Sequence, residues 1–138
     1  MASRGYRLAA AAGRMAFDLV IDIENNPGAL ARVAAAISDA GVNIAAATGV
    51  GTGPRAELHI LVPHPEAAKH ALAISQLAVT REREVVVVDV EDRPGVLADL
   101  TRKIARAGVD LDLVYVATRN RVVFGARNLE GLRAALDA

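Results

Sequence analysis

Two short turns, NNPG at residues 25–28 and DRPG at residues 92–95, carry the groups most able to bind a small charged ligand. Each turn joins a β-branched run to a run with helical spacing, so its glycine lies near a helix start. Glycine lets a ligand approach the backbone closely, and the amides and dipole of a helix start favour an anion such as a carboxylate. The side-chain amides of Asn25 and Asn43 suit an ammonium group beside that carboxylate. Together these groups predict a site for a zwitterion, that is, for an amino acid.

The same turns also have a purely structural interpretation. Proline fixes φ and is favoured at the first position of a helix, where we expect Pro27 and Pro94 to lie. A capping turn does not require glycine directly after proline, however, and glycine lowers helix stability relative to alanine. The ligand-site interpretation accounts for this glycine, and the structural one accounts for the proline.

Acidic pairs and a glycine-rich segment are further features that invite a chemical role. Asp22 and Glu24 are two residues apart on a predicted strand, as are Asp89 and Glu91, so each pair shares a face. We expect these acids to border the strand end and the helix start, where negative charge is favoured. The segment GVGTG (residues 49–53) runs from strand to strand, whereas phosphate-binding loops run from a strand into a helix. We therefore expect it to be a flexible hairpin.

The three histidines do not form a metal or catalytic set in the sequence. His59 falls on the polar face of a strand, His64 lies in a PHP loop and His70 lies on a helix. Their spacing is not the i, i+4 spacing of a helical metal pair, so we expect surface side chains. The chain has no cysteine, which excludes disulfides, thiol chemistry and thiolate metal sites. We predict no catalytic residue, no metal and no cofactor.

The elements that position the two turns form an internal repeat. Residues 22–44 align without a gap with residues 89–111, at an offset of 67 residues (94 − 27). The identical pairs include the two strand acids, the proline and glycine of each turn, and a later glycine followed by valine. We interpret this repeat as a duplication.

Each copy predicts the order strand, helix, strand, strand, helix. Leu30 belongs to the apolar stripe expected on the first helix, and Asn128 is a natural N-cap of the last one. Gly41 and Gly108 lie where a left-handed C-terminal helix cap belongs. The strands are predicted at residues 17–23, 42–48, 55–62 and 78–84 in the first copy and at residues 85–90, 109–118 and 121–126 in the second, and the second helices at residues 65–76 and 129–137.

These elements predict an α+β fold of two ferredoxin-like βαββαβ units, with antiparallel sheets and helices on one face. The last strand of the first copy runs into the first strand of the second without a break, so one long strand is expected to join them. The second copy ends at Ala138 and lacks its last strand. We predict a disordered or alternative-start extension at residues 1–15, a first unit at residues 16–84 and a second unit at residues 85–138.

Composition excludes several classes of partner. The 138 residues are 53% hydrophobic, which is enough for a real core, and no run approaches the roughly 18 apolar residues of a membrane span. Lys+Arg and Asp+Glu each number 16, so the basic surface that drives nucleic-acid binding is lacking, and aromatic residues for base stacking are scarce. We expect a cytoplasmic location, with no nucleic-acid and no membrane partner.

The string IENNPGALARVAAAISDAGVNIAA (residues 23–46) resembles the amino-acid-binding ACT domain family. The resemblance covers about residues 16–138, nearly the whole chain, and its duplication is similar to that of free-standing tandem ACT proteins. It implies a ferredoxin-like fold and a ligand bound at the interface between ACT units. The turn after the first strand of one unit and the start of the second strand of its neighbour would form that site.

The resemblance implies two sets of site residues, one for each copy. Asp92 and Asp110 replace Asn25 and Asn43 in the second copy, and two carboxylates would attract an ammonium but repel a carboxylate. We therefore expect unequal copies: one binds and the other is a structural partner, or each site mixes residues of both, and the first copy is the better candidate. The residues are Asn25, Asn26, Gly28, Ala29, Leu30, Asn43 and Ile44 in the first copy and Asp92, Arg93, Gly95, Val96, Leu97, Asp110 and Leu111 in the second.

The sequence thus predicts a non-enzymatic, amino-acid-binding regulatory protein that acts as a homodimer or through an enzyme partner, with ligand bound between ACT units. The alternative is a regulatory subunit of a separate amino-acid biosynthetic enzyme whose own ligand binding is weak or lost. A small ferredoxin-like enzyme of the acylphosphatase type would need an anion-binding arginine on a glycine-rich first loop. Neither copy has one.

Overall fold

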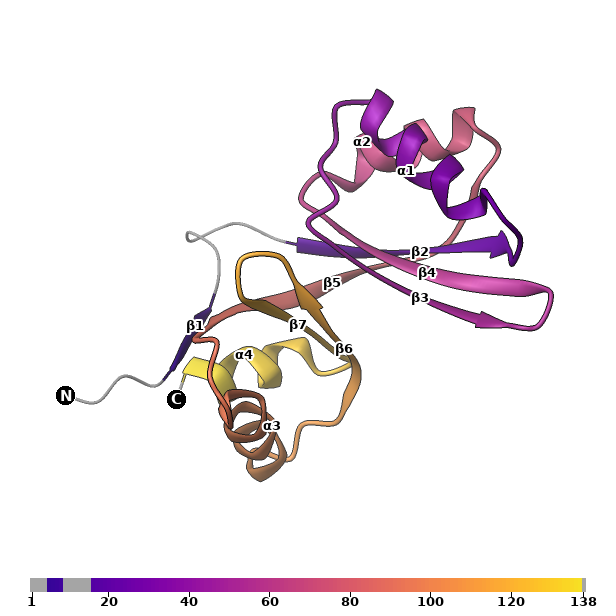
Figure 1. Cartoon of the computed structure of the whole chain (residues 1–138). Coiled ribbons are helices and arrows are strands. Elements are labelled where there is room, and N and C mark those ends of the chain that lie inside the picture. The colour runs from indigo at the N-terminus through magenta and orange to yellow at the C-terminus, as the bar shows by residue number, and fades with distance from the viewer. Residues whose placement is uncertain (1–4, 9–15, 138) are drawn as a thin grey trace. The chain divides into compact units, whose positions relative to one another are not determined.

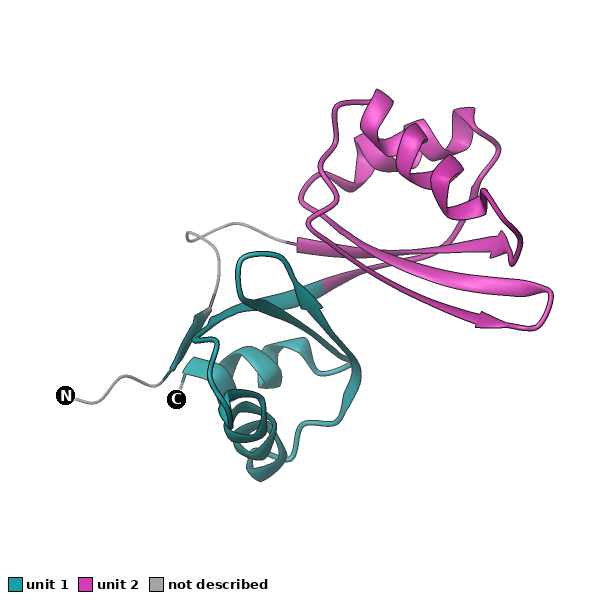
Figure 2. Ribbon diagram, in the orientation of Figure 1, with its two compact units in different colours: residues 1–15, 85–138 teal, residues 16–84 magenta. Residues whose placement is uncertain are grey.

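The computed structural model describes residues 5–8 and 16–137 and divides the chain into two compact units (Figure 1, Figure 2). The first-copy unit comprises residues 16–84. The second-copy unit comprises residues 85–137 together with residues 5–8. Each unit has its own sheet, core and helices, and they are described separately below.

The first-copy unit is a complete βαββαβ arrangement. Its elements are β2 (Ala16–Glu24), α1 (Ala29–Asp39), β3 (Ala46–Thr52), β4 (Arg55–Val62), α2 (Pro65–Ile74) and the first part of β5 (Ala78–Val90). The strand order β3-β4-β2-β5 is that of a ferredoxin-like sheet, with antiparallel pairing of β2 and β3 with β4. Alternate residues of β2 and β4 point to the two helices and form the core with them, including Leu19, Ile21, Ile60 and Val33.

The second-copy unit has the same strand order, but it takes its fourth strand from the other end of the chain. Its elements are the later part of β5, α3 (Val96–Arg106), β6 (Leu111–Ala117), β7 (Arg121–Ala126), α4 (Leu129–Asp137) and β1 (Tyr6–Leu8). The order is β1-β5-β7-β6, so β1 occupies the edge that the fourth strand of a βαββαβ unit would occupy. Two ferredoxin-like α+β units are therefore confirmed, and no strand follows α4 among the described residues.

The short strand β1 was not expected from the sequence, which predicts a disordered or alternative-start extension at residues 1–15. Tyr6 pairs with Val90 in antiparallel register, and its hydroxyl donates a hydrogen bond to the backbone oxygen of Leu136 at 3.0 Å. Lys103 Nζ donates to the same hydroxyl at 2.7 Å. Tyr6 thereby joins β5, α3 and α4. The other residues of the predicted extension, 1–4 and 9–15, lie outside the described part of the chain.

Several local predictions are confirmed, because short-range signals determine them. Gly41 and Gly108 have φ of 73° after their helices, as left-handed C-terminal caps require. Asn128 Oδ1 accepts a hydrogen bond from the backbone N–H of Gly131 at 2.9 Å, which makes Asn128 the predicted N-cap. The expected long strand between the copies is β5, with 13 residues.

Three local predictions are wrong. Pro27 and Pro94 do not occupy the first helical position, because α1 and α3 begin two residues later. The segment at residues 49–53 is not a loose loop, because β3 continues to Thr52 and the turn is confined to Gly53 and Pro54. Leu30 does not face the core; its relative exposure is 58%.

No helix in the described ranges is both long and apolar enough to cross a membrane.

Candidate functional site

The glycine of each turn has a left-handed backbone that only glycine adopts readily. Gly28 has φ 89° and ψ −12°, and Gly95 has φ 91° and ψ −13°. The positive φ alone therefore explains both glycines, without a ligand. A Cβ added at either position would meet no atom within 4 Å, so the space beside each glycine is open. The two turns thus share one backbone geometry and one accessible face.

In the first copy, the two asparagines of the turn hold neighbouring segments in place. The backbone N–H of Asn25 donates to Pro54 O at 3.0 Å and its Nδ2 donates to Gly53 O at 2.9 Å, so Asn25 fixes the turn of the β3–β4 hairpin. Asn26 Nδ2 donates to Glu24 Oε2 at 2.8 Å. Glu24 is the last residue of β2, so the acid and the amide form a polar edge at the strand end.

In the second copy, the corresponding polar edge is an ion pair. Arg93 replaces Asn26, and its Nε lies 3.0 Å from Glu91 Oε2. The backbone N–H of Glu91 donates to Gly5 O at 2.8 Å, so the segment leading into β1 lies beside this turn. Asp92 is exposed. Glu91 is therefore already neutralised by Arg93 within the chain.

The apolar residues after each turn divide into buried and exposed members. Ala29 and Val96 are buried in the cores, so a ligand could reach only their backbones. Leu30 and Leu97 are exposed, with relative exposures of 58% and 44%. Exposed leucines at equivalent positions of both copies provide apolar surface beside each turn.

The residues predicted to complete the site lie at the opposite end of each unit. Asn43 and Ile44 precede β3, after the end of α1, and Asp110 and Leu111 lie at the corresponding place before and at the start of β6. An 11-residue helix spans about 16 Å, which separates Asn43 from the turn at residues 25–28. The structure thus does not bring these two groups of predicted residues together within either unit. Asn43 and Asp110 are exposed, and Ile44 and Leu111 are half-buried against the cores.

A cavity of about 240 Å³ lies beside the first-copy turn. It is formed by the end of β2, the first turn of α1, the start of β4 and the corner between α2 and β5. The sequence indicated the acids Asp22 and Glu24 at this strand end, but not Arg32, Arg55 or the corner residues that packing brings to them. No sequence pattern indicates that packing brings these residues together.

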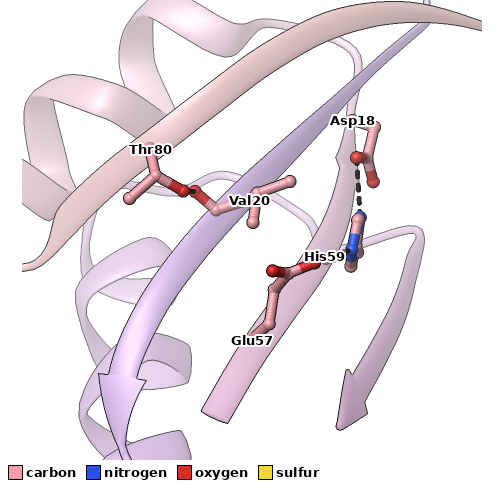
Figure 3. A network of polar contacts seen from close by, with 5 residues as sticks. All are labelled: Asp18, Val20, Glu57, His59 and Thr80. Carbon is pink, nitrogen blue, oxygen red and sulfur yellow. Dashed lines mark hydrogen bonds and ion pairs between the residues drawn. The ribbon is translucent and has the colours of Figure 1, made fainter. Parts of the chain in front are cut away.

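A second polar cluster that the sequence missed lies on the β2–β4 pair (Figure 3). The Asp18 side chain is fully buried, and its Oδ2 lies 2.8 Å from His59 Nδ1. His59 Nε2 lies 2.9 Å from Glu57 Oε1. The hydrogen bond to Asp18 raises the pKa of His59 above its ordinary value, although burial opposes the shift. The expectation that His59 is a surface side chain is wrong, since its side chain is only 16% exposed.

Comparison with known proteins identifies a sequence family. The model of the ACT domain matches the chain twice, at residues 17–79 and 85–133, which are the two copies of the repeat. No curated protein matches the sequence.

The same architecture occurs in solved structures. Protein BT0572 from Bacteroides thetaiotaomicron is 26% identical, with a TM-score of 0.80 over 90% of this chain and 88% of that one. The ligand-free regulatory subunit of aspartate kinase from Thermus thermophilus is 21% identical, with a TM-score of 0.67 over 97% and 96% of the two chains. The corresponding subunit from Thermus flavus has the same TM-score at 19% identity, over 96% and 95%. At such identities the last two likenesses concern the fold.

Proposed function

The chain belongs to the ACT domain family, and from that premise we propose that it is a non-catalytic regulatory protein that binds a free amino acid where two ACT units meet. The observation that carries this proposal is the duplicated turn, with an open left-handed glycine followed by an exposed leucine in both copies. The open glycine leaves the backbone accessible to a carboxylate, and the leucine offers apolar contact to the rest of the ligand.

The position of the remaining site residues supports a site built from two units. Asn43 and the turn at residues 25–28 are separated by the length of α1, so one small ligand cannot contact both within one unit. A ligand held by both would bridge the turn of one unit and the strand start of another. Such a ligand shifts the packing of the units only as far as its affinities for the two arrangements differ. We place this regulatory equilibrium in the cytoplasm, in a homodimer or with an enzyme partner.

The first copy is the better candidate for ligand binding. Its turn carries the amides of Asn25 and Asn26, the second of which binds Glu24, whereas the second-copy turn carries the Glu91–Arg93 ion pair and the exposed Asp92. If neither copy binds, the chain would act as a regulatory subunit of a separate amino-acid biosynthetic enzyme. Structural likeness to a regulatory subunit of aspartate kinase supports this second function.

A ligand screen with matched variants tests the proposal. We expect at least one common amino acid, at millimolar concentration, to raise the melting temperature of the full chain. Asn43→Ala should remove that shift, and Asp110→Ala should leave it largely intact. Gly28→Ala and Gly95→Ala should each lower the free energy of unfolding by about 1–2 kcal/mol because of their positive φ, but only the first should weaken ligand binding. No shift with any common amino acid would overturn the proposal.

A further inference from the structure

The edge of β5 in the second-copy unit is covered by a very short strand (Figure 1). Strand β1 pairs with β5 through three residues, from Tyr6–Val90 to Leu8–Val88, whereas β2 and β4 pair through eight. A peripheral element with so few contacts opens more easily than the rest of its unit. When β1 leaves, residues 88–90 present unpaired backbone groups on that edge, which form a template for another extended segment. We call the position that β1 fills, between this edge, α3 and α4, the strand slot.

The strand slot has a specific place for a tyrosine side chain. The Tyr6 hydroxyl donates a hydrogen bond to the backbone oxygen of Leu136 at 3.0 Å and accepts one from Lys103 Nζ at 2.7 Å. The Lys103 ammonium also lies 5.3 Å from the centroid of the Tyr6 ring, which is close enough for a cation–π attraction. A phenylalanine in this place would lose both hydrogen bonds. The slot therefore favours an aromatic ring that carries a hydroxyl.

The position before the tyrosine favours glycine. Gly5 is buried with a φ of 78°, and a Cβ at this position would collide with the Arg93 guanidinium. Glu91 holds that guanidinium by an ion pair of 3.0 Å, and the backbone N–H of Glu91 donates to Gly5 O at 2.8 Å. A side chain at position 5 would therefore need both a strained backbone and a displaced Arg93. Arg7, by contrast, lies 3.6 Å from Asp89 and is 81% exposed, so its pair adds little.

The first-copy unit lacks an equivalent strand slot in the part of the chain that the structure describes. Its fourth strand is the first part of β5, which continues without a break into the second copy and so cannot leave its edge. At the offset of 67 residues, Ala36 stands where the second copy has Lys103, and Ala36 is buried in the core. No ammonium is available there for a tyrosine ring. The slot is therefore a property of the second copy.

We propose that the strand slot also binds residues 5–7, Gly-Tyr-Arg, of a second copy of this chain, so that two chains exchange their β1 strands. Of the two tyrosines in the sequence only Tyr6 follows a glycine, so this segment is the one that fits. An exchanged strand makes the same contacts as the chain's own strand, so exchange is opposed mainly by the high local concentration of that own strand. Exchange therefore increases with protein concentration. The inference goes beyond the proposed function, because it does not depend on a bound amino acid.

Disulfide formation between full-length chains tests the exchange, because the chain has no cysteine of its own. Arg7 and Asp89 are direct partners in antiparallel register, and a separation of about 5.5 Å between the Cα atoms of such partners permits a disulfide. Chains with Arg7→Cys alone are mixed with chains with Asp89→Cys alone, so a linked heterodimer requires the segment of one chain in the slot of the other. Asp22→Cys, at the equivalent position of the first copy, is the matched control. We expect several-fold more heterodimer with Asp89→Cys; equal yields overturn the proposal.

A synthetic segment measures the specificity of the slot. A fluorescein-labelled peptide of residues 3–10, SRGYRLAA, is titrated into the full chain, and fluorescence anisotropy records its binding. Because the chain's own β1 competes, Tyr6→Ala in the protein should tighten binding of the peptide. To that protein, peptides with Tyr6→Ala or Gly5→Val should bind about tenfold more weakly, as expected for lost hydrogen bonds or a steric clash. A peptide with Arg7→Gln should bind nearly as well as the parent peptide.

Variants of the slot distinguish this binding from a general attraction. In the Tyr6→Ala protein, Lys103→Met should weaken binding of the parent peptide about tenfold, whereas Lys69→Met, which removes a lysine from the first-copy unit, should not. Circular dichroism spectra check that the variants are folded. Equal binding of the parent and Tyr6→Ala peptides, or no binding at millimolar concentration, overturns the slot. Neither experiment uses an amino-acid ligand, so failure here leaves the proposed function intact, and failure of the ligand screen leaves the slot intact.

Discussion

In the first-copy unit, Glu24 at the end of the first strand accepts a hydrogen bond from the side-chain amide of Asn26. In the second-copy unit, the corresponding acid, Glu91, accepts one from the guanidinium of Arg93. The backbones of the two turns are nearly identical, with glycine φ of 89° and 91°. Proline and glycine therefore determine the conformation of the turn, and the neighbouring side chains determine how much charge is left for a ligand. The two copies therefore share one turn conformation and differ in the charge beside it.

A second difference between the units lies on the first strand and the third strand of each. At the offset of 67 residues, Asp18 corresponds to Val85, and the strand register places Val123 where the first copy has His59. Val85 and Val123 are buried, at 2% and 0% exposure. The first copy thus holds a polar pair where the second holds two valines. Both solutions fill the same position in the fold, with different dependence on pH.

The largest expected effect tests whether the two units have equivalent cores. Ile37 and Ile104 occupy equivalent positions on α1 and α3, at 0% and 1% exposure. Truncation to alanine removes buried methylene groups and leaves a cavity, so Ile37→Ala and Ile104→Ala should each lower the free energy of unfolding by about 2–5 kcal/mol. Urea denaturation measures both. A loss below about 1 kcal/mol in one variant alone would show that the equivalence does not extend to the core.

Replacement of His59 tests the polar pair against the valine pair. His59→Val removes a hydrogen bond to the buried Asp18 carboxylate, so the free energy of unfolding at pH 6 should fall by about 1.5–3 kcal/mol. Asp18→Val/His59→Val copies the arrangement of Val85 and Val123 and should recover much of that loss, because a well-packed apolar pair often replaces a buried ion pair without net destabilisation.

The same cluster gives the first-copy unit a pH dependence. The pKa of His59 is raised in the folded state by the hydrogen bond to Asp18, so folding favours the protonated ring. This contribution is fully present below the ordinary histidine pKa of about 6.5 and is lost as pH rises through the higher folded-state pKa. The free energy of unfolding should therefore decrease as pH rises above 6.5, and this decrease should be absent in the double variant. A decrease of the same size in both proteins would remove His59 as its origin.

The origin of the fourth strand is the next difference to test. Tyr6→Ala removes a half-buried ring and its hydrogen bonds to Leu136 and Lys103, so the second-copy unit should lose about 2 kcal/mol. Hydrogen exchange of the β5 amides at residues 88–90 should accelerate, while amides of β2 and β4 keep their protection. Arg7→Gln is the control, because the Arg7–Asp89 pair is long, at 3.6 Å, and Arg7 is 81% exposed. Equal acceleration in both units would contradict a role of β1 confined to one.

Features that depend on residues close together in the chain were predicted from the sequence, whereas features that depend on distant residues were not. The repeat, the helix caps at Gly41 and Gly108 and the N-cap at Asn128 follow from residues a few positions apart, and the structure confirms them. Strand β1 could not be predicted in this way, because three residues show no clear period and their partner, β5, lies some 80 positions along the chain. Local sequence rules therefore identify individual helices and strands. The pairing of strands that lie far apart in the chain is seen only in the three-dimensional fold.

The same distinction between nearby and distant residues applies to the candidate site. The sequence indicated the turns and the strand-end acids from residue type alone. It placed Pro27 and Pro94 at the helix start, where the positive φ of the following glycine prevents helical geometry and moves the start to the next residue. It missed Arg32 at the cavity, because the packing of α1 on α2 brings Arg32 there. It also missed His59 beside Asp18, because the register of β2 with β4 brings these two side chains together. The predicted pairing of Asn43 with the turn stays a prediction.

The smallest expected effect concerns the second helices of the two units. In α4 the Asn128 side chain accepts a hydrogen bond from the N–H of Gly131, whereas His64 before α2 makes no side-chain cap, although its backbone (φ −126°, ψ 86°) is non-helical as a cap requires. Asn128→Ala should lower the free energy of unfolding by about 1 kcal/mol, and His64→Asn should raise it by about 0.5 kcal/mol. Urea denaturation measures both. If His64→Asn has no effect, the difference between α2 and α4 lies in the packing of the helix start and cannot be transferred by its cap residue.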